Sequence, residues 1–274
     1  MRCIAHISDL HFGTEDAAIC AALKKDLLEQ DPSLIANSGD LTQRARGAQF
    51  RAAKKFLDEL PQPQIVVPGN HDVPLFDVFR RFLSPLGRYR KIISPEVDPC
   101  YEDSEIVLLG LNTARSLTWK SGRISLEQIE RIRSRLSGAG GDQFKIVMTH
   151  HPFLPPPGDP VHAIDLVGRA AKALPVIDEC GVDLLLAGHL HHGYSGDVRS
   201  FYPATSRSII VVQAGTAISR RVRTEPNGYN ILRLDRTTIE IEVRVWNGSA
   251  FVRDKLVVYR LKEKEWVLQK STGE

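Results

Sequence analysis

The sequence lacks long hydrophobic runs. No apolar stretch approaches the roughly 20 residues that a membrane-spanning helix needs. Met1 to His6 lead straight into a short apolar segment, without the extended hydrophobic region of a signal peptide. We therefore expect a soluble protein without a membrane span, and a cytoplasmic location by default.

Cysteine is scarce and scattered. The 274 residues contain four cysteines, and no two of them form a CxxC pair. They are Cys3, Cys20, Cys100 and Cys180. In a chain of this length such spacing predicts reduced, mostly buried thiols, and it argues against a disulfide framework or a zinc knuckle.

The chain has no large excess of charge of either sign, since the net charge is only +3. Arginines gather at 80–90, 131–135 and 220–223. Such groups would suit an anionic substrate, although solvated surface arginines are the simpler interpretation. We expect no stable nucleic-acid partner.

The first two-thirds of the chain alternates β-rich runs with amphipathic helical stretches, which is typical of a layered α/β fold. Helical faces are expected from Phe50 to Leu60 and from Leu126 to Leu136, the second behind a Ser125-x-x-Gln128 capping box. Six strands are predicted in this part, at Cys3–Ile7, Leu34–Asn37, Gln64–Val67, Ile106–Leu111, Lys145–Thr149 and Asp183–Ala187.

The last quarter of the chain is different in character. It contains four β-like runs with turn signals between them, at Ser208–Gln213, Tyr229–Leu234, Ile239–Val245 and Leu256–Leu261. Apolar and charged residues alternate in the third run, which predicts one solvated face. We interpret residues 1–274 as a single domain, with a motif-bearing α/β part at about 1–205 and a β-rich part at about 206–274 that completes a second sheet.

Five polar segments each follow a predicted strand directly. They are Ser8-Asp9-Leu10-His11, Ser38-Gly39-Asp40, Pro68-Gly69-Asn70-His71-Asp72, Thr149-His150-His151-Pro152 and Gly188-His189-Leu190-His191. In open α/β sheets, ligand sites gather outside the carboxyl ends of the strands. We therefore expect these distant segments to converge at one edge.

The residue types in these segments are those of a mixed nitrogen and oxygen metal site. Imidazoles and carboxylates suit zinc, iron, manganese, cobalt or nickel, whereas a magnesium or calcium site would be nearly all oxygen. There are too many ligands for one tetrahedral zinc ion. Two aspartates, one asparagine and four histidines, with one carboxylate shared, would give two ions four protein ligands each.

Each segment alone also has a plainer interpretation. A lone Asp-x-His or Gly-Asp at a strand end is compatible with a simple turn, the His150-His151 pair with buried core histidines, and the histidines after Gly188 with a mononuclear site. Their common position after strands, and their order along the chain, favour one shared metal centre.

This ordered set resembles the motifs of the calcineurin-like metallophosphoesterase superfamily. Within it the chain most resembles the bacterial class III cyclic-nucleotide phosphodiesterase and glycerophosphodiesterase branch. The residues that carry the resemblance are Asp9-x-His11, Gly39-Asp40, Gly69-Asn70-His71-Asp72, His150-His151-Pro152 and Gly188-His189-x-His191.

The resemblance implies a four-layer α/β/β/α sandwich of two mixed sheets flanked by helices, with two metal ions at the strand ends. One ion would be held by Asp9, His11 and His191, the other by Asn70, His150 and His189, and Asp40 would bridge them. The ions would be divalent or trivalent transition metals, with manganese, iron, zinc and cobalt the candidates.

The same resemblance gives catalytic roles to two residues of the central motif. His71 would face the substrate phosphate instead of binding metal, and Asp72 would fix the tautomer and orientation of His71. Two ions about 3.5–4 Å apart can share a hydroxide that attacks phosphorus, hold a phosphate oxygen and stabilise in-line displacement. His71 would stabilise the developing charge or protonate the leaving oxygen.

The substrate is harder to predict than the chemistry. Hydrolysis of a small phosphodiester is the first choice, such as a cyclic nucleotide or a glycerophosphodiester. The alternatives are a phosphomonoesterase or nuclease of the same superfamily, and a non-catalytic metal-binding scaffold. Protein phosphatase activity is disfavoured, because that branch carries a GDxxDRG-type segment and ends its central motif in Glu, whereas Gly39 to Ala45 differ and Asp72 ends the motif here.

Residues outside the motifs supply further candidates. Substrate contacts are expected from Asn112, Arg115, Arg44 and Arg220, with Arg221 an additional cation, although each arginine is also compatible with simple solvation. The loop Phe153–Val161 is either a wall of the substrate pocket or a rigid crossover. His6 and His162 are expected to be structural, and His192 either supports the site or lies on the surface. A homodimer through the exposed edge of the C-terminal sheet is also expected.

Overall fold

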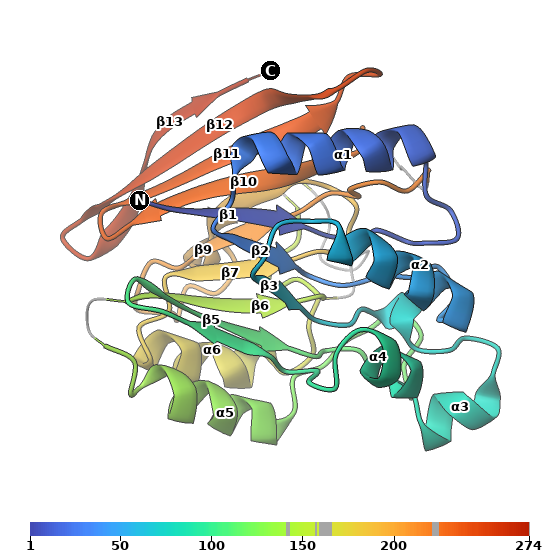
Figure 1. Cartoon of the computed structure of the whole chain (residues 1–274). Coiled ribbons are helices and arrows are strands. Elements are labelled where there is room, and N and C mark those ends of the chain that lie inside the picture. Colours follow the sequence, from blue (N-terminus) through green and yellow to red (C-terminus); the bar gives the residue numbers. More distant parts are fainter. Residues whose placement is uncertain (141–142, 157, 159–165, 221–224, 274) are drawn as a thin grey trace.

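Two β-sheets packed face to face form the centre of the molecule, and helices cover the outer face of each sheet (Figure 1). The computed structural model describes residues 1–140, 143–156, 158, 166–220 and 225–273. Both sheets contain parallel and antiparallel neighbours. The predicted four-layer α/β/β/α sandwich of two mixed sheets is therefore confirmed.

The first sheet joins the two ends of the chain. Its strand order is β13-β12-β11-β10-β1-β2-β3, with β1, β2 and β3 parallel and β10 antiparallel to β1. The strands are β1 (Arg2–Ile7), β2 (Leu34–Asn37), β3 (Gln64–Val66), β10 (Gly228–Asp235), β11 (Thr238–Trp246), β12 (Phe251–Lys262) and β13 (Glu265–Thr272).

The second sheet has the order β4-β5-β6-β7-β9-β8, with four parallel strands in the middle and an antiparallel strand at each edge. The strands are β4 (Cys100–Glu102), β5 (Ile106–Leu111), β6 (Phe144–Thr149), β7 (Leu184–Ala187), β8 (Tyr194–Asp197) and β9 (Ile210–Gln213). The β5 strand is buried along its whole length, as its uniformly apolar sequence predicts.

The sequence led us to expect that the part of the chain from about 206 onward completes the second sheet, but this part divides between the two sheets. Only β9 joins the second sheet, next to β7, whereas β10 to β13 extend the sheet that begins with β1. The reason lies in β1, which has a free edge opposite β2 that β10 fills, with Ile4 opposite Leu232. Both sheets therefore carry motif-bearing strands.

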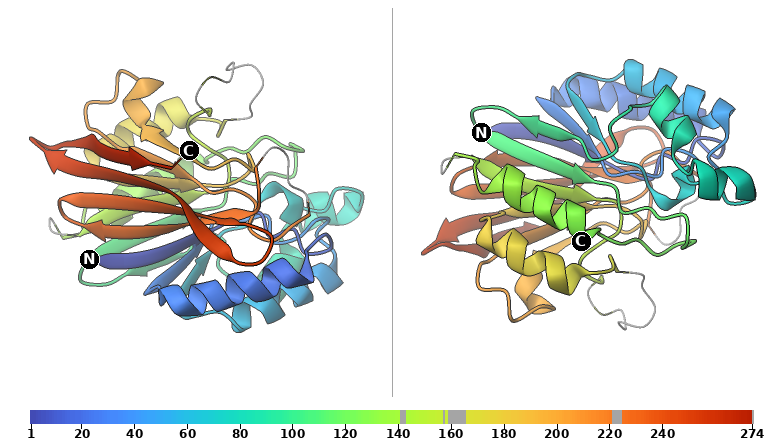
Figure 2. Two further views of the ribbon diagram at one scale, coloured as in Figure 1. Left: turned by 90° about the horizontal axis from the view of Figure 1, so that it is seen from above. Right: turned by 90° about the horizontal axis from the view of Figure 1, so that it is seen from below.

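Three apolar layers hold the sandwich together. The middle layer lies between the sheets, where Ile4 and Leu34 of the first sheet belong to the same buried cluster as Ile146 and Leu184 of the second. The first sheet is covered by α1 (Ala17–Gln30) and α2 (Gly47–Asp58), and the second by α5 (Leu126–Leu136) and α6 (Ala170–Glu179), as the two views of Figure 2 show.

The shorter helices lie mostly in the loops. The 3-10 turn η1 (Asn70–Asp72) and the helices α3 (Val78–Leu83) and α4 (Gly87–Ile92) follow β3, and η3 (Val198–Ser200) follows β8. Among the described residues, no helix is both long and apolar enough to cross a membrane.

The predicted capping box starts α5. The Gln128 backbone amide donates to Ser125 Oγ at 3.1 Å, and the Ser125 amide donates to Gln128 Oε1 at 2.8 Å. These bonds satisfy two backbone amides that would otherwise lack partners at the first turn. The helix therefore begins where the sequence predicts it.

The charged face of β11 is mostly covered, contrary to the sequence-based expectation, although the Glu240 side chain is still 28% exposed. Glu242 is only 6% exposed, because α1 passes over this face of the sheet. Arg244 binds Asp26 of α1 through two hydrogen bonds of 2.7 Å, and its third guanidinium nitrogen donates to Glu242 at 2.6 Å. The alternation of charged and apolar residues therefore marks an ion-pair network between helix and sheet.

Removing one charge from this network is expected to be costly. Replacing Asp26 with asparagine would leave the Arg244 guanidinium buried with less compensation, and we expect a loss of about 3 kcal/mol in the free energy of unfolding. Urea denaturation followed by circular dichroism measures it. The matched control is Asp58→Asn, where an exposed pair with Lys54 is worth about 0.5 kcal/mol or less. Equal, small losses in both variants would contradict the account.

Candidate metal centre

The five polar segments meet at the carboxyl ends of β1, β2, β3, β6 and β7, which come from both sheets. Asp9 and His11 follow β1, Asp40 follows β2, and Asn70 follows β3. The histidines of the second sheet follow β6 and β7. Eight of these aspartate and histidine side chains fall into four overlapping groups of the kind that holds a metal ion. The predicted convergence is thus observed.

The first group consists of Asp9, His11 and His191. The Asp9 Oδ1, His11 Nε2 and His191 Nε2 atoms lie 3.4 Å from one another. Such a triangle has a point about 2.0 Å from all three atoms, which is the length of typical zinc bonds to nitrogen and oxygen. Asp9 Oδ1 is buried and accepts no hydrogen bond. A buried, unpaired carboxylate oxygen is costly unless a cation neutralises it, so this group fits a metal ion.

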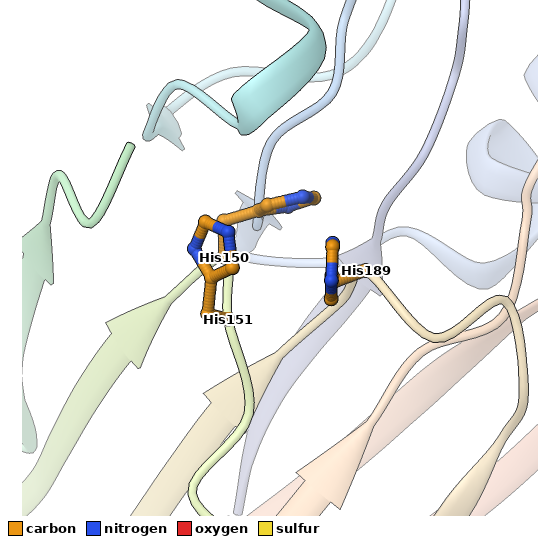
Figure 3. A group of neighbouring side chains, drawn as sticks. All are labelled: His150, His151 and His189. Carbon is orange, nitrogen blue, oxygen red and sulfur yellow. The ribbon is translucent and has the colours of Figure 1, made fainter. Parts of the chain in front are cut away.

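The second group consists of Asn70, His150 and His189. Asn70 Oδ1 lies 3.1 Å from His150 Nε2 and 3.1 Å from His189 Nδ1. His150 extends from the loop after β6, and His189 faces it from the loop after β7 (Figure 3). An amide oxygen and two imidazole nitrogens are again ligands that suit a transition metal.

Asp40 lies between the two groups. Its Oδ2 atom is 3.8 Å from His11 Nε2 and 3.4 Å from His150 Nε2. Its Oδ1 atom accepts a 2.8 Å hydrogen bond from the His71 amide. One oxygen of this carboxylate therefore faces both groups while the other anchors the chain.

Hydrogen bonds behind the cluster fix the orientation of several candidate ligands. His150 Nδ1 donates to the Ser38 carbonyl at 2.8 Å, and His191 Nδ1 is bonded to the Thr216 hydroxyl. Asp9 Oδ2 accepts from Ser8 Oγ at 2.7 Å. In His150 and His191 the other ring nitrogen, Nε2, therefore faces the cluster. Hydrogen-bond partners behind a metal-ligating histidine generally orient its ring in this way.

Five of the seven predicted metal ligands have left-handed backbone conformations, which are rare for residues with a side chain. The φ angles are +53° at Asp9, +49° at His11, +55° at Asp40, +78° at His189 and +60° at His191. Each such residue costs of order 1 kcal/mol or more, and strain of this kind gathers at functional sites. The fold holds these side chains together at the expense of stability.

Glycines let the loops approach one another closely. Gly39 has a φ of +107°, as the sharp turn before Asp40 requires. Gly69 instead serves close approach, because a Cβ there would lie 2.1 Å from Asp40 Oδ1. Gly188 has the same role and was not predicted: a Cβ would lie 1.9 Å from Ser8 Oγ.

The buried charges of the cluster shift one another's pKa values. Burial favours the neutral carboxyl, but the neighbouring histidines hold the pKa values of Asp9 and Asp40 well below their usual range. Burial alone would lower the pKa of His150, yet the carboxylates of Asp40 and Asp9 raise it to about 9. Burial and His150 lower the pKa of His189 to about 3. Without a metal, the cluster thus holds a proton on His150.

Metal uptake is therefore expected to depend on pH. Below about pH 9 a proton on His150 must leave before Nε2 can bind a metal, so the affinity should rise about tenfold per pH unit as pH increases. Mn²⁺ titrations of the metal-free protein from about pH 6.5 to about pH 8.5 measure this slope. An affinity that stays constant over the interval would contradict the assignment.

His71 lies at the rim of the cluster. Its Nδ1 atom donates to the Gln43 carbonyl at 2.9 Å. The Arg44 Nη1 atom lies 3.5 Å from His71 Nδ1. The His71 ring stands edge-on to that of His11, with centroids 4.8 Å apart. The Gln43 carbonyl therefore fixes the orientation of the His71 ring, which is expected from the sequence to face the substrate phosphate.

Asp72 has different partners from those predicted. Its two carboxylate oxygens accept hydrogen bonds from the backbone amides of Leu41, Thr42 and Gly69, at 3.1, 2.9 and 3.0 Å, and a fourth from the Thr42 hydroxyl. Burial and the charge of Asp40 raise its pKa to about 6. Asp72 thus ties the loop after β2 to the loop after β3, rather than orienting the His71 ring.

His151 lies beside the second group but is bonded elsewhere. Its Nε2 atom donates to the Lys120 carbonyl at 2.7 Å, and its Nδ1 atom accepts from the Thr113 hydroxyl at 2.7 Å. Burial, with His189 and His150 nearby, lowers its pKa well below the usual value. Although Figure 3 shows it next to His150, both ring nitrogens are engaged, so it serves as a neutral support.

The predicted substrate contacts separate into two sets. Arg44 lines the pocket beside Asn70 and His71. Asn112 and Arg115 instead line a different pocket, bounded by α5 residues and by no predicted metal ligand. There Arg115 donates to two backbone carbonyls and to Gln128 Oε1. These two residues therefore hold α5 in place, contrary to expectation.

The remaining candidates lie outside the cluster. Arg220 is exposed and pairs with Asp16 at the start of α1. His6 is buried against Ser38 Oγ at 3.0 Å, and burial lowers its pKa to about 3, in keeping with a structural role. His192 is half-exposed and pairs with Glu225. Outside the described residues lie His162, Arg221 and most of the segment 157–161.

Sequence reasoning did not predict the pocket beside His71. Its volume is about 220 Å³, and Trp119 and Lys120 from the loop after β5 line it together with Val73 and Leu75. The only signal in the sequence was the position of these residues, shortly after a motif or a strand. The sequence also could not identify the Ser38 and Gln43 backbone carbonyls as hydrogen-bond acceptors, because every residue has a backbone carbonyl.

Comparison with known proteins agrees with this geometry. A model of the calcineurin-like phosphoesterase family matches residues 4–193, which include all seven predicted ligands. A probable cyclic nucleotide phosphodiesterase of Synechococcus is 26% identical over 201 residues, covering 70% of this chain and 74% of the relative. Glycerophosphodiester phosphodiesterase GpdQ of Enterobacter lignolyticus is 26% identical over 163 residues, covering 56% and 57%.

Solved structures show the same fold at low sequence identity. Purple acid phosphatase PPD1 from yellow lupin seeds has a TM-score of 0.63 and 13% identity, with 92% of this chain covered and only about half, 52%, of that protein. Vacuolar protein sorting 29 of Cryptosporidium parvum has a TM-score of 0.51 and 12% identity, with 94% and 98% covered.

Proposed function

The chain belongs to the calcineurin-like phosphoesterase family, and from this premise we propose that it is a phosphodiesterase that uses two transition-metal ions. One observation carries the proposal. Six donor side chains form two ligand groups, and one oxygen of a seventh residue, Asp40 Oδ2, faces both groups. Manganese, iron, zinc and cobalt all suit these donors.

When bound, two such ions polarise the phosphate and lower the pKa of water at the site. The residues then decide the charge of the centre. Two divalent ions carry about +4, and Asp9 and Asp40 neutralise two of these charges, so an anionic phosphodiester is attracted. Because Asn70 is neutral, it preserves this attraction, whereas a carboxylate at the same position would weaken it.

His71 has the position expected of an acid or charge stabiliser. The Gln43 carbonyl holds Nδ1 of His71 and so orients the ring at the rim of the cluster. Arg44 stands beside it and brings a positive charge to the same rim. We assign proton donation to His71 and phosphate attraction to Arg44.

The relatives support a diester as the substrate. Both of the curated relatives are phosphodiesterases by name, one for cyclic nucleotides and one for glycerophosphodiesters. The scaffold alternative is disfavoured by the completeness of the ligand set, since a chain with no need of metal has no reason to keep five strained ligand positions.

Two matched chromogenic substrates test the proposal. Protein loaded with Mn²⁺, Co²⁺ or Zn²⁺ is expected to hydrolyse bis(4-nitrophenyl) phosphate faster than 4-nitrophenyl phosphate. Faster monoester hydrolysis would favour a phosphomonoesterase, and inactivity on both with every metal would favour a scaffold. A panel of 3′,5′- and 2′,3′-cyclic nucleotides, glycerophosphodiesters and single-stranded DNA then identifies the ester.

Two expectations from the sequence stay predictions. The cytoplasmic location is one. The other is a homodimer through the C-terminal sheet, for which the edge strand would be β13. Sedimentation of the purified protein measures the second.

A further inference from the structure

A small pocket opens beside His71, and nothing in the motif set accounts for it. We propose that this pocket receives a planar aromatic ring of the substrate, a nucleobase being the biological example, with Trp119 as the residue that selects it. The inference rests on the proposed phosphodiesterase function and adds the substrate class.

The pocket is continuous with the metal centre. Asn70 and His71 form part of its wall. The Asn70 Nδ2 group donates to the Trp119 carbonyl at 3.4 Å, so the loop that carries Trp119 is joined directly to a metal ligand. A group attached to a phosphate at the metal centre would therefore lie beside this pocket.

The lining combines an aromatic face with apolar and cationic side chains. Trp119 is 67% exposed, and Val73 and Leu75 are aliphatic residues of the lining. Arg44 and Lys120 bring positive charge to the same pocket. Indole and guanidinium groups both stack on planar rings. A flexible polar group such as glycerol would gain little from these walls.

The size of the pocket fits one ring system. Its volume is about 220 Å³, compared with the roughly 150 Å³ of an engineered cavity that binds benzene. It is below the roughly 300–1,000 Å³ typical of sites for whole drug-sized ligands. It therefore suits one part of a substrate whose phosphate lies at the metals.

Arg81 of α3 holds the Trp119 loop in place. Arg81 is only 5% exposed, and its guanidinium donates to the carbonyls of Ser116 at 2.7 Å, Pro74 at 2.8 Å and Thr118. The same guanidinium lies 5.9 Å from the centroid of the Trp119 ring. A buried cation that binds both walls of the pocket gives Trp119 a defined position, as ring recognition requires.

Two small phosphonates that differ only in the ring test the proposal. Phenylphosphonate and methylphosphonate carry the same phosphonate group, so both report on the metal centre, and only the first carries a ring. Titration calorimetry of the Mn²⁺-loaded protein measures their binding without any turnover. We expect phenylphosphonate to bind about tenfold more tightly, the effect of one stacked ring.

Variants assign the preference to Trp119. In Trp119→Ala the two affinities should become equal through weaker binding of phenylphosphonate, while methylphosphonate binds as before. Trp119→Phe should keep most of the preference. Phe79→Ala, at an aromatic residue that is 82% exposed and does not line the pocket, should keep all of it.

Three results would overturn the inference. If the original chain bound both phosphonates equally, the proposed ring site would be wrong, whereas the proposed metal centre would stand. A preference that survives in Trp119→Ala would assign it to another residue. If the chain bound neither phosphonate, both the proposed ring site and the phosphate site that the proposed function requires would be wrong.

Discussion

Replacing Asp40 with alanine is expected to lower phosphodiester turnover more than about a thousandfold and to remove metal from the protein. Groups that only orient a metal ligand cost about 10–100-fold when they are lost. Asp40 should cost more, because its Oδ2 atom lies within 3.8 Å of donors in both ligand groups. Loss of this one carboxylate would remove the oxygen that faces both groups and a negative charge that would offset the two cations.

The measurement is metal content by mass spectrometry, alongside turnover of bis(4-nitrophenyl) phosphate. Asp58→Ala is the matched control, because its carboxylate lies on the exposed face of α2 and pairs with Lys54. The control should keep both metal and activity. If Asp40→Ala kept the metal content of the original chain, the bridging assignment would be wrong.

Replacing His71 with glutamine is expected to lower kcat by about 10²–10⁴, the range for loss of a general acid. Metal content should change little, since the proposed ligand set does not include His71. The loss should be largest for diesters with an alkyl leaving group, which depend most on proton donation, and smaller for 4-nitrophenyl esters. Comparing kcat for the two kinds of ester, with metal content measured in parallel, separates an acid from a ligand.

His192→Gln is the control for a histidine near the site, because His192 pairs with Glu225 at the surface. It should keep turnover and metal content. A His71→Gln protein that lost metal together with activity would instead make His71 a ligand, which its grouping with His11 and Asp40 also allows geometrically.

Most of the candidate metal centre could be predicted from the sequence, because its donor side chains lie within short motifs directly after strands. Parallel strands bring such positions to one edge whatever the details of packing. Asp9 and His191 illustrate this, since they are far apart in sequence and yet their ligand atoms are 3.4 Å apart. For this pair, residue type and position directly after a strand were sufficient to predict that the two side chains lie together.

The rest depends on packing between elements, which local patterns do not encode. Whether Glu242 is solvated depends on α1, which is distant in sequence. Three of the four donors to Asp72 are backbone amides, which every residue except proline has, so no motif distinguishes them from the His71 ring. Asn112 and Arg115 follow a strand of the second sheet, as metal ligands do, but Gln128 of α5 holds them away from the cluster.

The central claim is that two ions share one site, and a count of bound metal tests it most directly. Metal-free protein dialysed against buffered Mn²⁺ is expected to retain two ions per chain at saturation, one for each ligand group. Retention of a single ion, or of none, would contradict the account.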